Sequence, residues 1–135
     1  MSVRYFGGFV KAPTNKETNH YMRGECAYLA LALNSLLKES ILMEVAGRHF
    51  LVKDGDGFYW DIRGRMDVQQ VKDGMVNNWS EHPVSRDDVL NILATGIYSD
   101  GPYVPHREKQ AKSLLRNLLP RDLNKVISRS RQQIP

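Results

Sequence analysis

The chain has 135 residues, of which 41% are hydrophobic and 25% are charged. This composition is typical of a globular protein and excludes a disordered or fibrous one. The length suits one domain with its own core and is too short for two. A single cysteine excludes an internal disulfide framework and a cysteine-rich zinc site.

Nothing in the sequence indicates a membrane or secreted protein. The longest apolar stretch, residues 26–33, is far shorter than the ~20 residues of a membrane-spanning helix. No apolar leader segment follows Met1. We therefore expect a cytoplasmic protein that makes no membrane contact.

The formal net charge of +4 is distributed unevenly. Residues 106–135 contain eight basic and two acidic residues, a net charge of +6, so the rest of the chain carries −2. Such a segment is either the charged outer face of an amphipathic helix or a surface that binds an acidic partner or nucleic acid. No aromatic residue follows Tyr103, so the segment lacks side chains that would stack on the bases of a single strand.

The first half of the chain predicts an arm, a helix and three strands. Residues 1–23 mix glycine, proline and polar residues, and they predict an irregular arm with at most one short strand. Residues 26–38 predict a helix that is apolar on every side and is therefore buried at the centre of the domain. Residues 41–46 predict a strand, and residues 49–53 and 58–63 predict a hairpin.

The second half predicts helices. Residues 68–79 predict one, and residues 86–94 predict another, which Ser85 and Asp88 begin with a capping-box arrangement. Residues 107–119 predict an amphipathic helix, which Pro120 interrupts, and residues 121–130 predict one more short helix.

Together these elements predict the α+β class. We expect a central buried helix packed on a small antiparallel sheet, helices on both sides of that sheet, and additional C-terminal helices. Residues 1–105 are expected to form a single core domain. Residues 106–135 are expected to form a basic helical segment that packs on this core or extends from it.

The hairpin sequence also predicts which side chains share a face. Its apolar residues are Phe50, Val52, Phe58, Trp60 and Ile62. They lie on one face only if Val52 pairs with Trp60 and Phe50 pairs with Ile62. This register implies a three-residue loop, residues 55–57, with glycine in the left-handed position. It also makes His49 and Asp61 diagonal neighbours on one face, within reach of each other.

Cys26 is the candidate nucleophile. It stands in the first turn of the predicted buried helix, where unpaired backbone N–H groups and the helix dipole favour a thiolate anion. Gly24 leaves room for a substrate carbonyl to approach the backbone N–H of Cys26, as an oxyanion site requires. Alternatively, a lone cysteine on an apolar helix is simply a small core side chain.

His49 and Asp61 supply the two other groups that thiol catalysis needs, a base for the thiol proton and a carboxylate that orients the base. The alternatives are a routine hydrogen bond for His49 and a salt bridge from Asp61 to a nearby arginine, Arg63 or Arg65. Because the three residues occur in the required order, we favour the catalytic interpretation. Asn19 and His20 are candidates for a second oxyanion donor. Alternatively, they are ordinary polar residues of a surface loop.

Three segments carry a resemblance to a known family: residues 24–32 (GECAYLALA), residues 49–52 (HFLV) and residues 59–64 (YWDIRG). They resemble the papain-like and transglutaminase-like Cys-His-Asp superfamily, and in particular its short bacterial, plasmid and phage members. The resemblance implies a cysteine at the start of a central helix and an antiparallel sheet that carries the histidine and then the aspartate. It implies thiol acyl transfer with Cys26 as nucleophile, His49 as base and Asp61 as the orienting group.

The functional prediction is a cysteine hydrolase or acyltransferase that acts on an amide, ester or thioester carbonyl of a protein or peptide-like substrate. The alternative is an inactive binding module that docks on a host protein or nucleic acid through its basic C-terminal helices. No cofactor or metal is expected, because the histidines lack metal-ligand spacing. A calcium loop beginning at Asp54 would need glutamate where Arg65 stands.

Overall fold

The computed structural model describes residues 5–73, 75, 78–96 and 102–123. Within these residues it has an α+β fold of five helices and one antiparallel sheet of five strands. The helices are α1 (Asn15–Met22), α2 (Cys26–Leu36), α3 (Val68–Asp73), α4 (Arg86–Ala94) and α5 (Pro105–Leu118). The strands are β1 (Ile41–Val45), β2 (His49–Lys53), β3 (Tyr59–Asp61), β4 (Gly64–Met66) and β5 (Glu81–Pro83), and they lie side by side in the order β4-β3-β2-β1-β5.

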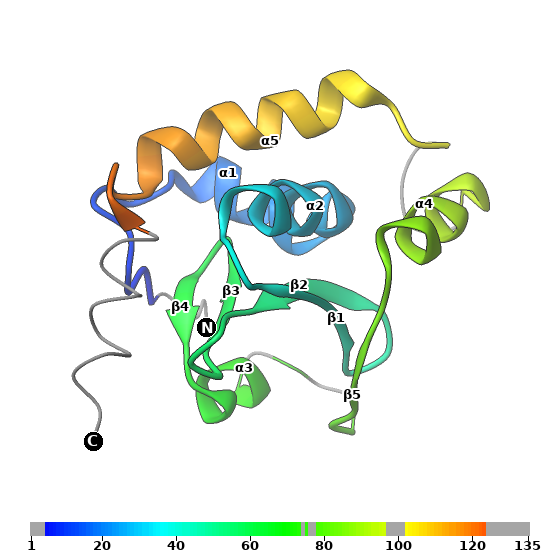
Figure 1. Ribbon diagram of the computed structural model, residues 1–135, viewed down its shortest axis with the longest axis horizontal. Coiled ribbons are helices and arrows are strands. Elements are labelled where there is room, and N and C mark those ends of the chain that lie inside the picture. The colour runs from blue at the N-terminus through cyan, green and yellow to red at the C-terminus, as the bar shows by residue number, and fades with distance from the viewer. Residues whose placement is uncertain (1–4, 74, 76–77, 97–101, 124–135) are drawn as a thin grey trace.

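The molecule is layered around α2. This helix lies between the sheet and α5, whereas α3 lies against the opposite face of the sheet (Figure 1). The strands alternate accordingly. Leu42, Phe50 and Val52 pack in the larger cluster with α2, while Met43 and Leu51 pack in the smaller cluster with α3. Helices therefore cover both sides of the sheet, as the sequence predicts.

The predicted central helix is confirmed. The first eight residues of α2 are all buried, because an apolar surface on every side must be covered by neighbours all round. The helix ends at Leu36, before the predicted end at residue 38, because Leu37 adopts an extended conformation.

The predicted hairpin register is also confirmed where the strands are paired. Val52 pairs with Trp60 and Lys53 with Tyr59. The hydrogen bond from Asp54 N to Phe58 O, 2.7 Å, then closes the loop over residues 55–57. Gly57 has φ +88°, the left-handed conformation that this three-residue loop requires.

Phe58 departs from the predicted apolar face. Its side chain is 39% exposed, and the guanidinium of Arg65 lies 4.3 Å from its ring centre. The residue lies at the end of the turn, one position before β3, outside the part of the hairpin that α2 covers. The other four predicted members of that face are buried.

The prediction of an irregular arm over residues 1–23 is wrong for residues 15–22, which form α1. Thr14 and Glu17 form a reciprocal capping box, in which the Thr14 hydroxyl accepts from Glu17 N and the Glu17 carboxylate accepts from Thr14 N. Tyr21 is the one buried residue of this helix, so its apolar pattern is weak.

Several other boundaries differ from prediction. β4 and β5 were not predicted, because each has only three residues and little apolar alternation. The predicted helix over residues 68–79 ends at Asp73. α4 has its predicted bounds and its Ser85–Asp88 capping box, and α5 begins at Pro105, ahead of the predicted residue 107. The predicted helix over residues 121–130 lies outside the described residues after Leu123.

The segment before α1 is attached to the edge of the sheet. Phe6 N donates to Arg63 O at 2.5 Å, Arg65 N donates to Gly7 O at 2.6 Å, and Gly7 forms a parallel bridge with Gly64. Gly64 has φ +94°, and a side chain at this position would collide with the Gly7 backbone. The arm therefore fixes the backbone of residues 63–65. In the part of the chain that the structure describes, no helix is long and apolar enough to cross a membrane.

Candidate active site

The topology brings the three candidate catalytic residues to one end of the sheet. Cys26 is the first residue of α2, His49 is the first residue of β2, and Asp61 is the last residue of β3. Because β2 and β3 are antiparallel neighbours, the start of one lies beside the end of the other. The start of α2 reaches the same end of the sheet (Figure 1).

His49 and Asp61 form a buried pair. His49 Nε2 lies 2.9 Å from Asp61 Oδ2, and the exposed fractions of the two residues are 9% and 2%. A buried carboxylate must be compensated by charged or hydrogen-bonding partners. The side-chain pairing that the hairpin register predicts is therefore confirmed.

The electrostatics of the pair favour its charged forms. Burial lowers the pKa of His49, but hydrogen bonds with Asp61 and Cys26 outweigh it and raise that pKa to about 9. Burial opposes ionisation of Asp61, but the charge of Arg63 and hydrogen bonds from His49 and Arg63 hold the pKa of Asp61 well below its usual range. Asp61 is thus an ionised acceptor, so the proton between the two side chains is carried by His49 Nε2.

Cys26 completes the group. Its thiol lies near enough to the His49 ring to help raise the pKa of that imidazole, and the residue is 7% exposed. Because Nε2 of His49 faces Asp61, Nδ1 is the ring nitrogen that remains for exchange with the thiol. The first-turn position leaves the backbone N–H groups of Cys26 and Ala27 without carbonyl partners inside the helix. The arrangement has the parts that transfer of a thiol proton to an imidazole requires.

Arg63 is the residue of this site that sequence reasoning did not assign to it. Its Nη2 donates to Asp61 Oδ2 at 2.6 Å, and its Nε lies 3.1 and 3.2 Å from Oδ1 and Oδ2. The Arg63 backbone N–H adds a bond to Oδ1 at 2.8 Å. A salt bridge from Asp61 to Arg63 was predicted only as an alternative to the histidine contact, but one carboxylate accepts both. The spacing Asp-x-Arg, which places the arginine in the turn directly after β3, was the available signal.

Asn19 and His20, the candidates for a second oxyanion donor, lie near the end of α1 and are exposed. Together with Gly24 and Glu25, the two residues that precede Cys26, they line a hollow of about 410 Å³. The remaining lining residues of this hollow are Lys16 and Arg23. Cys26 and His49 are not among the residues that line this hollow, so neither candidate is placed at the thiol.

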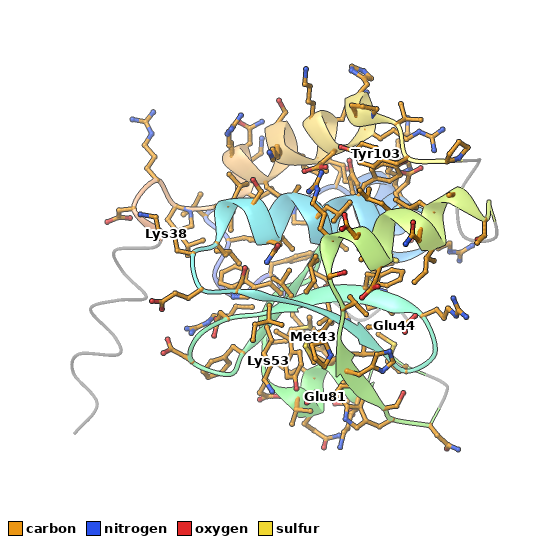
Figure 2. The ribbon with its side chains drawn as sticks, turned by 45° about the vertical axis from the view of Figure 1, so that its right-hand side comes forward. Lys38, Met43, Glu44, Lys53, Glu81 and Tyr103 are labelled. Carbon is orange, nitrogen blue, oxygen red and sulfur yellow. The ribbon has the colours of Figure 1, made fainter. Side chains whose placement is uncertain are left out.

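The start of α2 is held by residues from the C-terminal half of the chain. Arg107 of α5 donates to Glu25 at 3.1 Å, and the Tyr28 hydroxyl accepts from Val104 N at 2.8 Å. Tyr103 stacks on Tyr28, with ring centres 5.8 Å apart, and lies between α2 and the start of α5 (Figure 2). These contacts fix the helix turn that carries Cys26.

The described residues contain no cluster of three or more His, Cys, Asp or Glu side chains that could hold a metal ion. The turn at Asp54 is instead a hydrogen-bonded hairpin loop. Asp54 accepts from the backbone N–H groups of Asp56 and Phe58. Comparison of the chain with protein-family models, curated proteins and solved structures gives no match.

Proposed function

We propose that this protein is a thiol-dependent acyl-transfer enzyme of the papain-like or transglutaminase-like Cys-His-Asp type. Its reaction is that of a cysteine hydrolase (a peptidase, isopeptidase or deamidase) or of an acyltransferase, acting on a protein or peptide-like substrate. The observation that supports this is the buried pair of His49 Nε2 and Asp61 Oδ2, 2.9 Å apart, beside the thiol of Cys26.

In the first half of the reaction, the Cys26 thiolate attacks the carbonyl carbon of an amide, ester or thioester, and negative charge develops on the carbonyl oxygen. The backbone N–H of Cys26 donates to this oxygen, and Asn19 or His20 supplies the second donor. The imidazolium of His49 then gives its proton to the leaving group as the bond to the carbonyl carbon breaks. An acyl thioester remains on Cys26.

In the second half, water or an amine attacks the thioester carbon. His49, now neutral, accepts the proton of the attacking group, and the bond to sulfur breaks to restore the thiolate. Water gives hydrolysis, and an amine gives acyl transfer. Asp61 keeps the ring oriented through both halves by its bond to Nε2.

Alkylation of Cys26 by iodoacetamide, followed by mass spectrometry, tests the proposal. An ordinary thiol is about 1% ionised at pH 6.5, because its pKa lies near 8.5. We expect the wild-type protein to react at pH 6.5 roughly a hundred times faster than such a thiol, and His49→Ala to lose most of this rate. With p-nitrophenyl acetate as acyl donor, an acetyl adduct should form on Cys26 and should be absent from Cys26→Ser.

His82→Ala is the matched control. His82 also bonds a carboxylate, with its Nε2 2.6 Å from Glu44 Oε1, but it lies on β5 and is exposed. Cys26 of the His82→Ala variant should be alkylated and acetylated at the same rates as Cys26 of the wild-type protein. Ordinary thiol kinetics in the wild-type protein, unchanged in His49→Ala, would overturn the enzyme proposal and leave the binding module as the better interpretation.

A further inference from the structure

Arg63 is buried far more completely than an ordinary surface arginine. It is 1% exposed, and its Nη1 atom is buried without a hydrogen-bond partner among the described residues. Burying a charged group with a donor left unpaired costs free energy, and a well-packed apolar residue is often as stable as a buried ion pair. Packing alone therefore does not account for a guanidinium at this position.

All other guanidinium contacts of Arg63 go to one carboxylate. Nε and Nη2 bind Asp61, and this fork leaves Oδ2 shared between Arg63 and His49. The planar fork fixes the plane of the carboxylate as well as its charge. Fixing that plane fixes the direction from which Oδ2 holds the imidazole ring.

The backbone that carries Arg63 is rigid. Its carbonyl accepts from Phe6 N, and its N–H donates to Asp61 Oδ1. The next residue, Gly64, is bridged to Gly7 of the N-terminal arm. A group that positions a catalytic side chain needs such support, because a loosely held partner would not define its orientation.

We propose that Arg63 is a positioning residue of the candidate active site, which holds Asp61 ionised and in the plane from which it orients His49. The part that Arg63 plays in the reaction rests on the proposed function. Its effect on the side chains of Asp61 and His49 does not. Among the described residues, the titratable and charged groups that act on His49 are Asp61 from β3 and Cys26 from α2, and Arg63 acts on Asp61.

The sign of the expected effect follows from charge. A buried positive charge disfavours proton binding by its neighbours, so its removal makes the whole group hold protons to higher pH. Arg63→Gln should therefore move the pH midpoint of Cys26 alkylation upward by about one unit, which slows alkylation about tenfold at pH values below the wild-type midpoint. The same substitution should also raise the pH at which the His49 ring loses its proton. Arg63→Lys keeps the charge but loses the planar fork, so its two pH midpoints should stay near those of the wild-type protein.

Arg65→Gln is the matched control, because Arg65 stands two residues further on and binds Asp54 and Asp56 instead of Asp61. Two measurements are made on each variant: the pH dependence of Cys26 alkylation, and the titration of the His49 ring followed by NMR. Both midpoints should move upward in Arg63→Gln and stay in place in Arg65→Gln. Thermal unfolding of each variant reports its stability separately.

If Arg63→Gln and Arg65→Gln lower the melting temperature and neither moves either midpoint, Arg63 is only structural and the inference is wrong. If Arg63→Gln does not fold, Arg63→Lys decides: retention of the wild-type midpoints supports the inference, and a shift as large as that of His49→Ala contradicts it. If Cys26 of the wild-type protein reacts as an ordinary thiol, the proposed function fails. The NMR titration of His49 then still decides whether Arg63 acts through Asp61.

Discussion

His49 links the chemistry of the site to the stability of the fold. Its pKa in the folded protein, about 9, lies above the usual value near 6.5. A group whose pKa is raised on folding stabilises the folded state fully below its unfolded pKa, and this contribution is lost as pH rises through the folded pKa. The relevant window is therefore from pH 6.5 to pH 9.

We predict that the free energy of unfolding declines across this window by at most about 3 kcal/mol, and that His49→Gln abolishes the decline. Urea denaturation at pH 6, 7.5 and 9 measures both. His82→Gln should decline as the wild-type protein does, because the His82 ring is exposed on β5. Parallel pH dependence in the wild-type protein and His49→Gln would mean that the imidazolium is not held in the folded state.

Asp61 shows why two interpretations of one residue need not compete. The sequence suggested either an orienting carboxylate for His49 or a salt bridge with Arg63, and the carboxylate makes both contacts. Its two oxygens offer about four acceptor positions, which the imidazole, the guanidinium and one backbone N–H occupy. The pKa of Asp61 lies below its usual range for the same reason, so this carboxylate stays ionised at every pH at which a thiol reacts.

At the scale of elements, the β2–β3 hairpin determines the geometry of the site, and one turn residue organises the hairpin. Asp54 accepts four hydrogen bonds, from Asp56 N, Phe58 N, Trp60 Nε1 and Arg65 Nε. The Trp60 indole is fully buried, so its N–H has no access to water if this partner is lost. The turn therefore sets the register that brings His49 opposite the end of β3.

Replacement of Asp54 by alanine should destabilise the protein by about 3 kcal/mol, because the buried Trp60 N–H and two backbone donors lose their acceptor. Asp56→Ala, which removes one of the two ion-pair partners of Arg65 and leaves the bond to Asp54 in place, should cost no more than about 1 kcal/mol. Calcium chloride should not change the melting temperature of the wild-type protein, because the Asp54 carboxylate is already fully engaged. Stabilisation by calcium, or equal losses in the two variants, would contradict this account.

The elements that the sequence predicts well are those whose apolar pattern is strong. The α2 helix is apolar on every side, and apolar residues alternate along both strands of the β2–β3 hairpin, so core formation alone selects their structure. From that register the contact between His49 and Asp61 follows without any reference to catalysis. The part of the site that can be predicted from the sequence is therefore the two strand residues, His49 and Asp61, and the position of Cys26 at the start of the helix.

The elements that were missed are those stabilised by polar or distant contacts. α1 has a single buried residue and begins with a Thr14–Glu17 capping box, a signal that was present in the sequence but stands outside any apolar run. β4 is fixed by its short pairing with β3 and by the arm at Gly7, and the contact with the arm joins segments far apart in the chain. Arg63 escaped assignment because burial of an arginine depends on the whole fold.

At the scale of the whole molecule, α5 belongs to the same core as the site. Ala111, Leu115 and Leu118 are buried in the cluster with α2, and Arg107 of the same helix binds Glu25 just before Cys26. Lys112 lies 3.8 Å from Glu108, so part of the basic charge of this segment is paired within the chain. α5 thus covers the central helix and supports the turn that presents the thiol.

We predict that Leu115→Ala destabilises the protein by about 3 kcal/mol, because Leu115 is fully buried between α5 and α2 and its truncation leaves a cavity in a close-packed core. Ser113→Ala, an exposed change on the same helix, should stay within about 0.5 kcal/mol of the wild-type protein. Urea denaturation of both variants gives the comparison. If α5 were only an appended basic segment, Leu115→Ala would unfold like Ser113→Ala, and Cys26 alkylation would be the same in both. If α5 is part of the core, Leu115→Ala unfolds at a lower urea concentration than the wild-type protein. Its rapid Cys26 alkylation should then disappear at that lower urea concentration as well.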